Sequence, residues 1–329
     1  MKKGLGFLLR IAVSLAAIGA LAYALRGKFH EAFLIFQKGI VWPWLLIGVS
    51  LFLIPTALIS WRLQMIFKVQ EVKVSFLESF YLSMLGLFFS LFFPSAIGGD
   101  VAKSYFAYQY SGKKLGSLTG VLLDRLLGLV TLVMITVVSV TFYSHRLEIP
   151  ALKRSIYGLM GAVIFGTLFL ANHQFAQKFQ FLSFLIPSSK LREKLAGLYH
   201  AIRGYRNHRR LLVNCCIISL VAQILFLAQN YFLARSLGIQ IALWPFFVLM
   251  PLVAFVSMAP SLSGLGVREA GFVFFLKNLI PAEQAFALSL LYDFVFYGCA
   301  LLGGLVFAFR GGLKKELLAG LEAVEEQEA

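Results

Sequence analysis

The chain has 329 residues, of which 60% are hydrophobic and only 14% are charged, and its formal net charge is +15. Soluble domains carry about 25% charged residues and about 45–50% apolar ones, so the composition excludes a water-soluble domain and predicts an all-α, multi-pass membrane protein. The net positive charge does not indicate a nucleic-acid partner, because the basic residues lie in short segments beside apolar stretches, where the positive-inside rule places them.

The first apolar segment, residues 4–26, imitates a secretory signal, and Ala22–Ala24 resembles a cleavage site. Arg10 interrupts its apolar core, and the rest of the chain needs a first span to set its topology. We therefore expect a retained transmembrane helix.

A transmembrane helix needs about 20 mostly apolar residues. Six segments meet this length, namely 4–26, 40–61, 117–142, 155–171, 211–232 and 282–309. Two further apolar regions, 75–110 and 242–279, are broken by Pro94 and Pro260, and the part after each break is too short or too polar to cross alone. We interpret both regions as re-entrant helical hairpins, which enter the membrane and return to the same side.

The order of these segments predicts an inverted repeat. Residues 1–150 and 151–310 each hold three spans and one hairpin, and an odd number of crossings inverts the second copy relative to the first. The two tips share letters, "PSAIGGD" and "PSLSGLG", although so short a match also arises by chance. Inverted repeats with broken helices that meet near the midplane are typical of secondary transporters.

The distribution of basic residues predicts the orientation. With the N-terminus in the cytoplasm, 20 of the 30 Lys and Arg residues fall in cytoplasmic segments, eight fall outside, and Arg125 and Arg268 lie within the membrane. Arg62 is counted among the cytoplasmic residues. Both termini are then cytoplasmic, residues 172–210 form a basic amphipathic segment on the inner leaflet, and 311–329 form a cytoplasmic tail.

The hairpin tips contain residues that break helices at membrane depth. Unpaired backbone groups are not tolerated in lipid, so such breaks indicate a protein-buried or water-filled cavity. Proline ends a helix, glycine permits close approach and positive φ, and the helix N-termini that follow favour anions. The predicted tip residues are Pro94, Ser95, Gly98, Gly99, Pro260, Ser261, Gly264 and Gly266.

Charged residues near the tips are the candidate transport residues, namely Asp100, Asp124, Arg125, Arg268 and Glu269. A charge at the bilayer centre costs about 2.5–3.5 kcal/mol on insertion scales, so these residues should be paired or functional. Neighbours on a helix point about 100° apart, so we expect pairs between segments, with Asp100 and Asp124 on Arg268, and Arg125 on Glu269. The alternatives are that the pairs only clamp the bundle and that Asp100 caps a helix. Glu78 and Asp293 are secondary candidates.

Lys103, Tyr105 and Tyr108 follow the first tip and are candidates for a cytoplasmic mouth that receives an anionic headgroup. An interfacial aromatic belt with a snorkelling lysine is the alternative. The three cysteines lie in apolar runs without zinc-ligand spacing, and the five histidines fall in loops or at segment edges. No nucleophile–base pair or nucleotide loop is visible. We therefore expect no metal, no cofactor and no enzymatic activity.

Three ordered blocks, "FFPSAIGGDVAKSYF", "GVLLDRLLGLV" and "PSLSGLGVREAGFVFF", resemble the signature blocks of the flippase-like family. This family is also called the lysylphosphatidylglycerol synthase transmembrane region and includes the membrane half of the bacterial multiple peptide resistance factor. The resemblance covers almost the whole chain and implies a bacterial-type inner-membrane protein that handles lipids. The family's charged positions correspond here to Asp100, Arg125 and Glu269. We expect no aminoacyl-transferase domain, so the synthase name does not imply that activity.

The sequence favours a lipid translocator that moves a phospholipid or other polar lipid between leaflets through a charged cavity. A membrane partner that positions a lipid-synthesis or lipid-modifying enzyme is the alternative, and a lipid transferase is less favoured. The expected partners are membrane lipids with anionic or phosphate-bearing headgroups. A second copy of the chain and a lipid-synthesis enzyme stay open as protein partners.

Overall fold

The computed structural model describes residues 29–92, 98–143, 158, 161, 204–257 and 264–309, and the secondary structure of these residues is helical. The helices are α2 (Phe29–Gln37), α3 (Trp42–Val69), α4 (Phe76–Phe92), α5 (Gly98–Ser111), α6 (Lys114–Tyr143), η3 (Tyr205–Asn207), α10 (Arg209–Ser236), α11 (Trp244–Val256), α12 (Val267–Leu276) and α13 (Ala282–Phe309). The prediction of an all-α chain is confirmed for this part of the protein.

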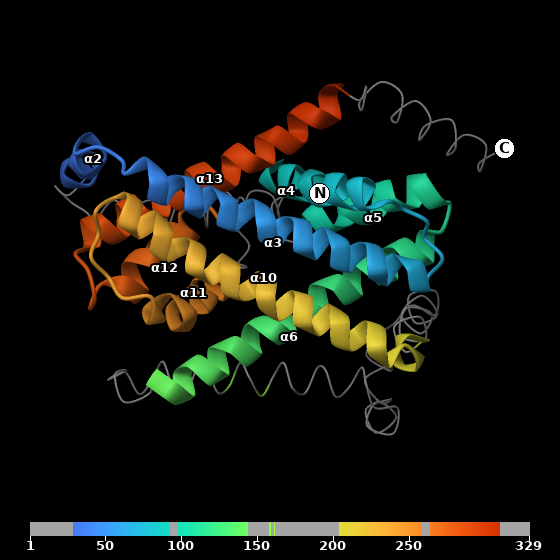
Figure 1. Cartoon of the computed structure of the whole chain (residues 1–329). Coiled ribbons are helices and arrows are strands. Elements are labelled where there is room, and N and C mark those ends of the chain that lie inside the picture. Colours follow the sequence, from blue (N-terminus) through green and yellow to red (C-terminus); the bar gives the residue numbers. More distant parts are fainter. Residues whose placement is uncertain are drawn as a thin grey trace, which may run out of the picture.

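Within the part of the chain that the structure describes, four helices, α3, α6, α10 and α13, are long and apolar enough to cross a membrane. They run across the view in Figure 1, where α3 and α10 lie side by side along most of their length. They correspond to the predicted spans 40–61, 117–142, 211–232 and 282–309. The other two predicted spans, 4–26 and 155–171, fall outside the described residues apart from Gly158 and Gly161.

The predicted end of the second span, at residue 61, is wrong, because α3 continues to Val69. The sequence places Arg62 at a cytoplasmic edge, whereas the structure buries it to 3% exposure. Leu63, Ile66 and Phe67 after it are also buried. A neighbouring carboxylate neutralises the Arg62 charge, as described below, so the helix and its apolar packing continue past this residue.

The apolar regions that are too short to span form two pairs of neighbouring helices. In the first pair, α4 and α5 pack together so closely that a Cβ atom on Gly99 would lie 2.2 Å from the carbonyl oxygen of Gly86. In the second pair, α11 packs against α12, and Gly264 and Gly266 before α12 both have φ of +81°. Glycine permits both features, since close backbone approach and positive φ disfavour a side chain. Pro94, Ser95, Pro260 and Ser261 lie outside the described residues.

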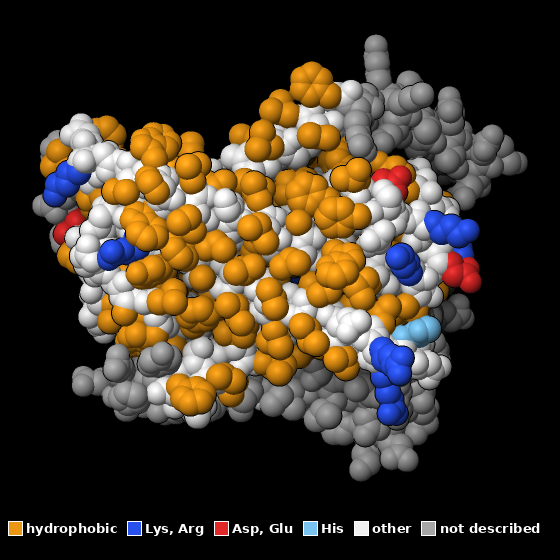
Figure 2. Space-filling view, in the orientation of Figure 1, with side chains coloured by type: hydrophobic (Ala, Val, Ile, Leu, Met, Phe, Trp, Pro, Cys, Tyr) orange, Lys and Arg blue, Asp and Glu red, His pale blue; other side chains and the backbone are white. Residues whose placement is uncertain are grey.

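The surface of the bundle suits a lipid environment. Hydrophobic side chains cover the middle of the face shown in Figure 2, and charged side chains gather toward its two ends. At one such end, Lys113 forms a hydrogen bond and ion pair with Glu71, which lowers the pKa of the Glu71 carboxyl. An apolar band between charged ends is the pattern expected of a bilayer-immersed protein.

Candidate functional site

A cavity of about 470 Å³ lies inside the bundle. Helices from both parts of the sequence line it: α3, α4, α5 and α6 from the first part, and α10, α11, α12 and α13 from the second. Apolar side chains such as Phe52, Leu132 and Phe226 share its wall with charged ones. The charged lining residues are Arg62, Asp100, Lys103, Asp124, Arg125 and Arg268. The structure therefore brings four of the five predicted transport residues to one cavity.

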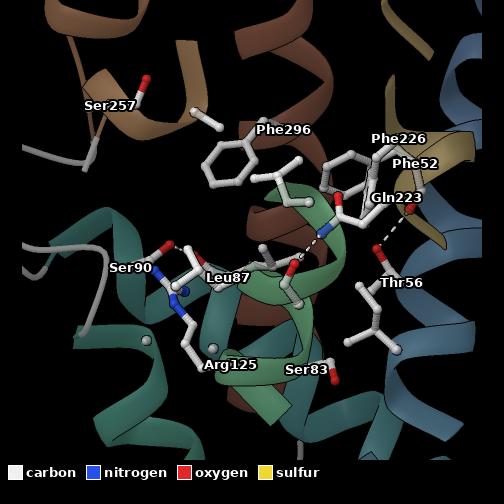
Figure 3. Close-up of a pocket in the computed structure, with 18 of the residues that line it drawn as sticks. Phe52, Thr56, Ser83, Leu87, Ser90, Arg125, Gln223, Phe226, Ser257 and Phe296 are labelled. Carbon is white, nitrogen blue, oxygen red and sulfur yellow. Dashed lines mark hydrogen bonds between the residues drawn. The ribbon is translucent and has the colours of Figure 1, made fainter. Parts of the chain in front are cut away.

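The first charged group joins α5 to α6. The Arg125 Nη1 atom lies 3.2 Å from Asp100 Oδ2, and the Lys103 Nζ atom lies 3.9 Å from Asp100 Oδ1. The Arg125 side chain is 41% exposed and extends toward Leu87 and Ser90 of α4 in Figure 3. Two cations face one carboxylate here, so this part of the wall carries one unbalanced positive charge.

The second charged group is a closed network that ties α3, α6 and α10 together. Arg62 Nε donates to Asp124 Oδ1 at 2.8 Å, and Arg62 Nη2 donates to the Asp124 carbonyl oxygen at 3.0 Å. Arg62 Nη1 donates to the hydroxyl of Ser219. The guanidinium is thus satisfied by partners on two neighbouring helices, and its charge is balanced by one carboxylate. Nearby, Gln223 donates to the carbonyl oxygen of Gly128 at 3.2 Å, a bond drawn in Figure 3.

The third charged group surrounds Arg268 at the start of α12. The Gly264 turn leads into this helix, and the Arg268 backbone N–H donates to the Gly264 carbonyl oxygen at 2.8 Å. The Arg268 Cζ atom lies over three rings of α13, 5.1 Å from the Phe296 centroid, 5.4 Å from that of Tyr292 and 5.6 Å from that of Tyr297. Aromatic faces stabilise a partly desolvated cation.

Arg268 also contacts two polar side chains of α13. Arg268 Nη2 lies 2.5 Å from Asp293 Oδ1 and donates to the Tyr297 hydroxyl at 3.0 Å. Glu269, the residue after Arg268 in α12, carries a second carboxyl group that is buried here. Both carboxyl-bearing residues are 5% exposed. Glu269 and Asp293 are not among the cavity-lining residues, whereas Arg268, the ion-pair partner of Asp293, is one of them.

The predicted pairing between the charged residues is wrong in its details. Among the described residues, Asp124 pairs with Arg62, Asp100 with Arg125, and Arg268 with Asp293. Each ion pair therefore joins helices of the same part of the chain. The sequence identified which residues need partners, but the choice depends on which helix faces meet, and Arg62 was missed altogether. The apolar residues that follow Arg62 are the signal that could have placed it inside a helix.

The other predicted site residues occupy different surroundings. Gly99 and Gly264 line the cavity, whereas Gly98 and Gly266 are buried outside its lining. Lys103 lines the cavity, but Tyr105 is 42% exposed and neither it nor Tyr108 is a lining residue. Glu78 is the secondary candidate that lies apart, since it accepts a hydrogen bond from the Ser75 backbone N–H at the start of α4.

Four long apolar helices around a charged internal cavity define a multi-pass helical membrane protein. Within that class, the chain belongs to the family described as the lysylphosphatidylglycerol synthase TM region, whose sequence profile matches residues 7–304. Membership of this family identifies a membrane protein related to lipid synthesis or lipid translocation. No curated protein and no solved structure matches the chain.

Proposed function

We propose that the protein is a lipid translocator, in which the headgroup of a phospholipid or other polar lipid passes through the cavity while its acyl chains stay in the bilayer. It acts as a transporter and not as a lipid transferase. One observation carries the proposal: the cavity within the bundle combines apolar walls with the Asp100–Arg125 ion pair, in which the Arg125 side chain is 41% exposed.

The Arg125 end of the cavity supports an anionic headgroup as the ligand. Arg125 and Lys103 together place two positive charges beside the single carboxylate of Asp100. A phosphate would complete the charge balance there, and the planar guanidinium can hold two phosphate oxygens at once. Arg62 differs from Arg125: it lines the same cavity, but each of its three guanidinium nitrogens already donates a hydrogen bond within the protein.

The arrangement of the short helices supports alternating access as the mechanism. In Figure 1, α4 and α5 connect to the bundle at one end of the long helices, and α11 and α12 connect at the opposite end. We propose that the two pairs are re-entrant hairpins of an inverted repeat, which enter from opposite sides. The proposed location is a bacterial-type inner membrane with cytoplasmic termini.

Transport can be tested with purified protein in vesicles that contain a trace of fluorescent phosphatidylglycerol or phosphatidylethanolamine. The measurement is the rate at which inner-leaflet label becomes accessible to an impermeant quencher. We expect the wild-type protein to exceed protein-free vesicles. Arg125→Gln should slow transport by about tenfold or more, because a charge-assisted hydrogen bond contributes about 1.5–3 kcal/mol.

The matched control is Arg210→Gln, since Arg210 is exposed at the start of α10 and lies outside the cavity. This variant should transport at the wild-type rate. Wild-type protein that moves neither lipid faster than empty vesicles would contradict the proposal and favour a partner of a lipid-synthesis enzyme. Equal rates for Arg125→Gln and wild type would remove Arg125 from the path.

A further inference from the structure

Two buried carboxyl groups meet beside the cavity where α12 packs against α13. Glu269 follows Arg268 in α12, Asp293 forms an ion pair with Arg268, and both carboxyl-bearing residues are 5% exposed. Within the described part of the chain, Glu269 Oε2 and Asp293 Oδ1 are both buried without a hydrogen-bond partner. An ionised carboxylate only accepts hydrogen bonds, so a proton held between the two groups would supply these oxygens with a donor. Two ionised carboxylates in one desolvated site also repel each other.

The surrounding charges lead to the same conclusion. Arg268 is the cation that contacts Asp293, and it balances one of the two carboxylates. The other titratable groups around Arg268 are the phenols of Tyr292 and Tyr297, which are neutral in their ordinary state. Helix α11, which packs against α12, contains no titratable side chain.

The remaining charged groups of the cavity have partners elsewhere. Arg62 is paired with Asp124, and Lys103 and Arg125 face Asp100. The residues of α10 and α4 that line the cavity are uncharged. Three atoms of this site, Arg268 Nε, Glu269 Oε2 and Asp293 Oδ1, are among the buried atoms of the described residues that have no hydrogen-bond partner. With both carboxylates ionised, this site would hold an uncompensated buried negative charge, which is strongly unfavourable.

We infer that Glu269 and Asp293 form a proton-binding site in which the two carboxyl groups hold one proton between them, and that an anion bound at Arg268 draws in a second. An anionic group that pairs with Arg268 competes with Asp293 for the same guanidinium. The carboxylate released in this way gains a proton from water and becomes a neutral acid. The second part of the inference rests on the proposed function and makes the protein a proton–anion symporter.

The proton itself can be observed without any transport measurement. Infrared spectra of the full chain in micelles of an ester-free detergent at neutral pH should show the carbonyl stretch of a protonated carboxylic acid. We expect Glu269→Gln and Asp293→Asn each to remove the band. Asp100→Asn should leave it in place, because Asp100 is a cavity carboxylate with cations of its own.

Absence of the band in the wild-type protein would overturn the inference. This outcome needs no variant, so the test holds even if a variant fails to fold. A band that persists in both Glu269→Gln and Asp293→Asn would overturn it as well, since the proton would then belong to another group.

The linkage to transport needs a second measurement. In the same vesicles with fluorescent phosphatidylglycerol, an imposed pH gradient should accelerate lipid movement away from the acidic side. The limit for one coupled proton is about tenfold per pH unit. Glu269→Gln should remove this dependence, whereas Arg210→Gln should keep it.

The two measurements separate the proton site from the proposed function. An infrared band with the expected behaviour in a protein that moves no lipid would contradict the translocator and leave the proton site supported. Lipid movement that ignores the pH gradient would leave the translocator supported and overturn the symport.

Discussion

Arg62 illustrates how a buried charge is accommodated in this protein. Its guanidinium donates to the side chain and backbone of Asp124 and to the Ser219 hydroxyl. A buried ion pair is not by itself a large source of stability, but loss of one partner leaves the other as an uncompensated buried charge. We therefore expect the loss of either Arg62 or Asp124 to destabilise the fold much more than the loss of both together.

A double-mutant cycle tests this dependence. We predict that Arg62→Met or Asp124→Leu alone lowers the free energy of unfolding by about 3–5 kcal/mol. The double variant should recover much of that loss, because it removes both charges together. The measurement is equilibrium unfolding of the purified protein in mixed micelles.

The control for the cycle is Lys113→Met, which breaks the exposed ion pair with Glu71. Exposed pairs contribute little, so this variant should unfold like the wild-type protein. Additive effects of Arg62→Met and Asp124→Leu would show that the two residues act independently.

The residue scale also shows the limit of sequence reasoning. The cost of a charge in lipid correctly indicated that Asp124 and Arg268 need partners. Which partner each one has depends on helix rotation, and one sequence does not reveal that rotation. The charge of Arg62 seemed to end the second span, but α3 continues past it to Val69. Arg62 therefore lies inside the bundle, where it pairs with Asp124.

At the scale of helices, the packing of α13 against α4 depends on two glycines. A Cβ atom on Gly303 would lie 2.6 Å from the Met84 carbonyl oxygen, and one on Gly304 would lie 2.2 Å from the ring of Phe88. Small residues let membrane helices approach closely, and van der Waals contact is then a main source of their association. Here the contact joins a helix of the first part of the chain to one of the second.

Alanine substitution on α13 measures the contribution of this contact. Gly303→Ala should destabilise the protein by about 1–3 kcal/mol, since the nearest obstacle is backbone and cannot rotate away. Gly298→Ala on the same helix is the matched control, because a Cβ atom there meets nothing within 4 Å. The measurement is equilibrium unfolding in micelles. Similar unfolding free energies for the two variants would contradict the packing described here.

The helices were the most predictable part of the structure. The span predicted at 282–309 coincides with α13, and the spans at 117–142 and 211–232 lie within α6 and α10. Length and continuous apolarity suffice for such segments. The end of α3 was missed because Arg62 interrupts the apolar run, although the apolar residues after it indicated that the helix continues.

At the scale of the whole molecule, the proposed topology places the loop between α5 and α6 and the end of α12 on opposite sides of the membrane. Lys114 and Lys277 are exposed residues that mark these two places. We predict that Lys114→Cys reacts with an impermeant thiol reagent only from the cytoplasmic side, and Lys277→Cys only from the outside. The background should replace Cys215, Cys216 and Cys299 with alanine.

The cysteine-free background, without either introduced cysteine, serves as the control and should not react from either side. Labelling of Lys114→Cys and Lys277→Cys from the same side would contradict the arrangement of opposed hairpins. Labelling of each from the side opposite to that expected would keep the opposed hairpins but reverse the orientation, which rests on the count of basic residues.

The backbone contact between Gly86 and Gly99 has a mechanical consequence. Because α4 and α5 approach each other so closely at this point, we expect them to move together as one unit. A rotation of one helix would then carry the other with it. The pivots for such a rotation are the connections at either side, where Glu71 and Gly112 adopt positive φ of 54° and 67°.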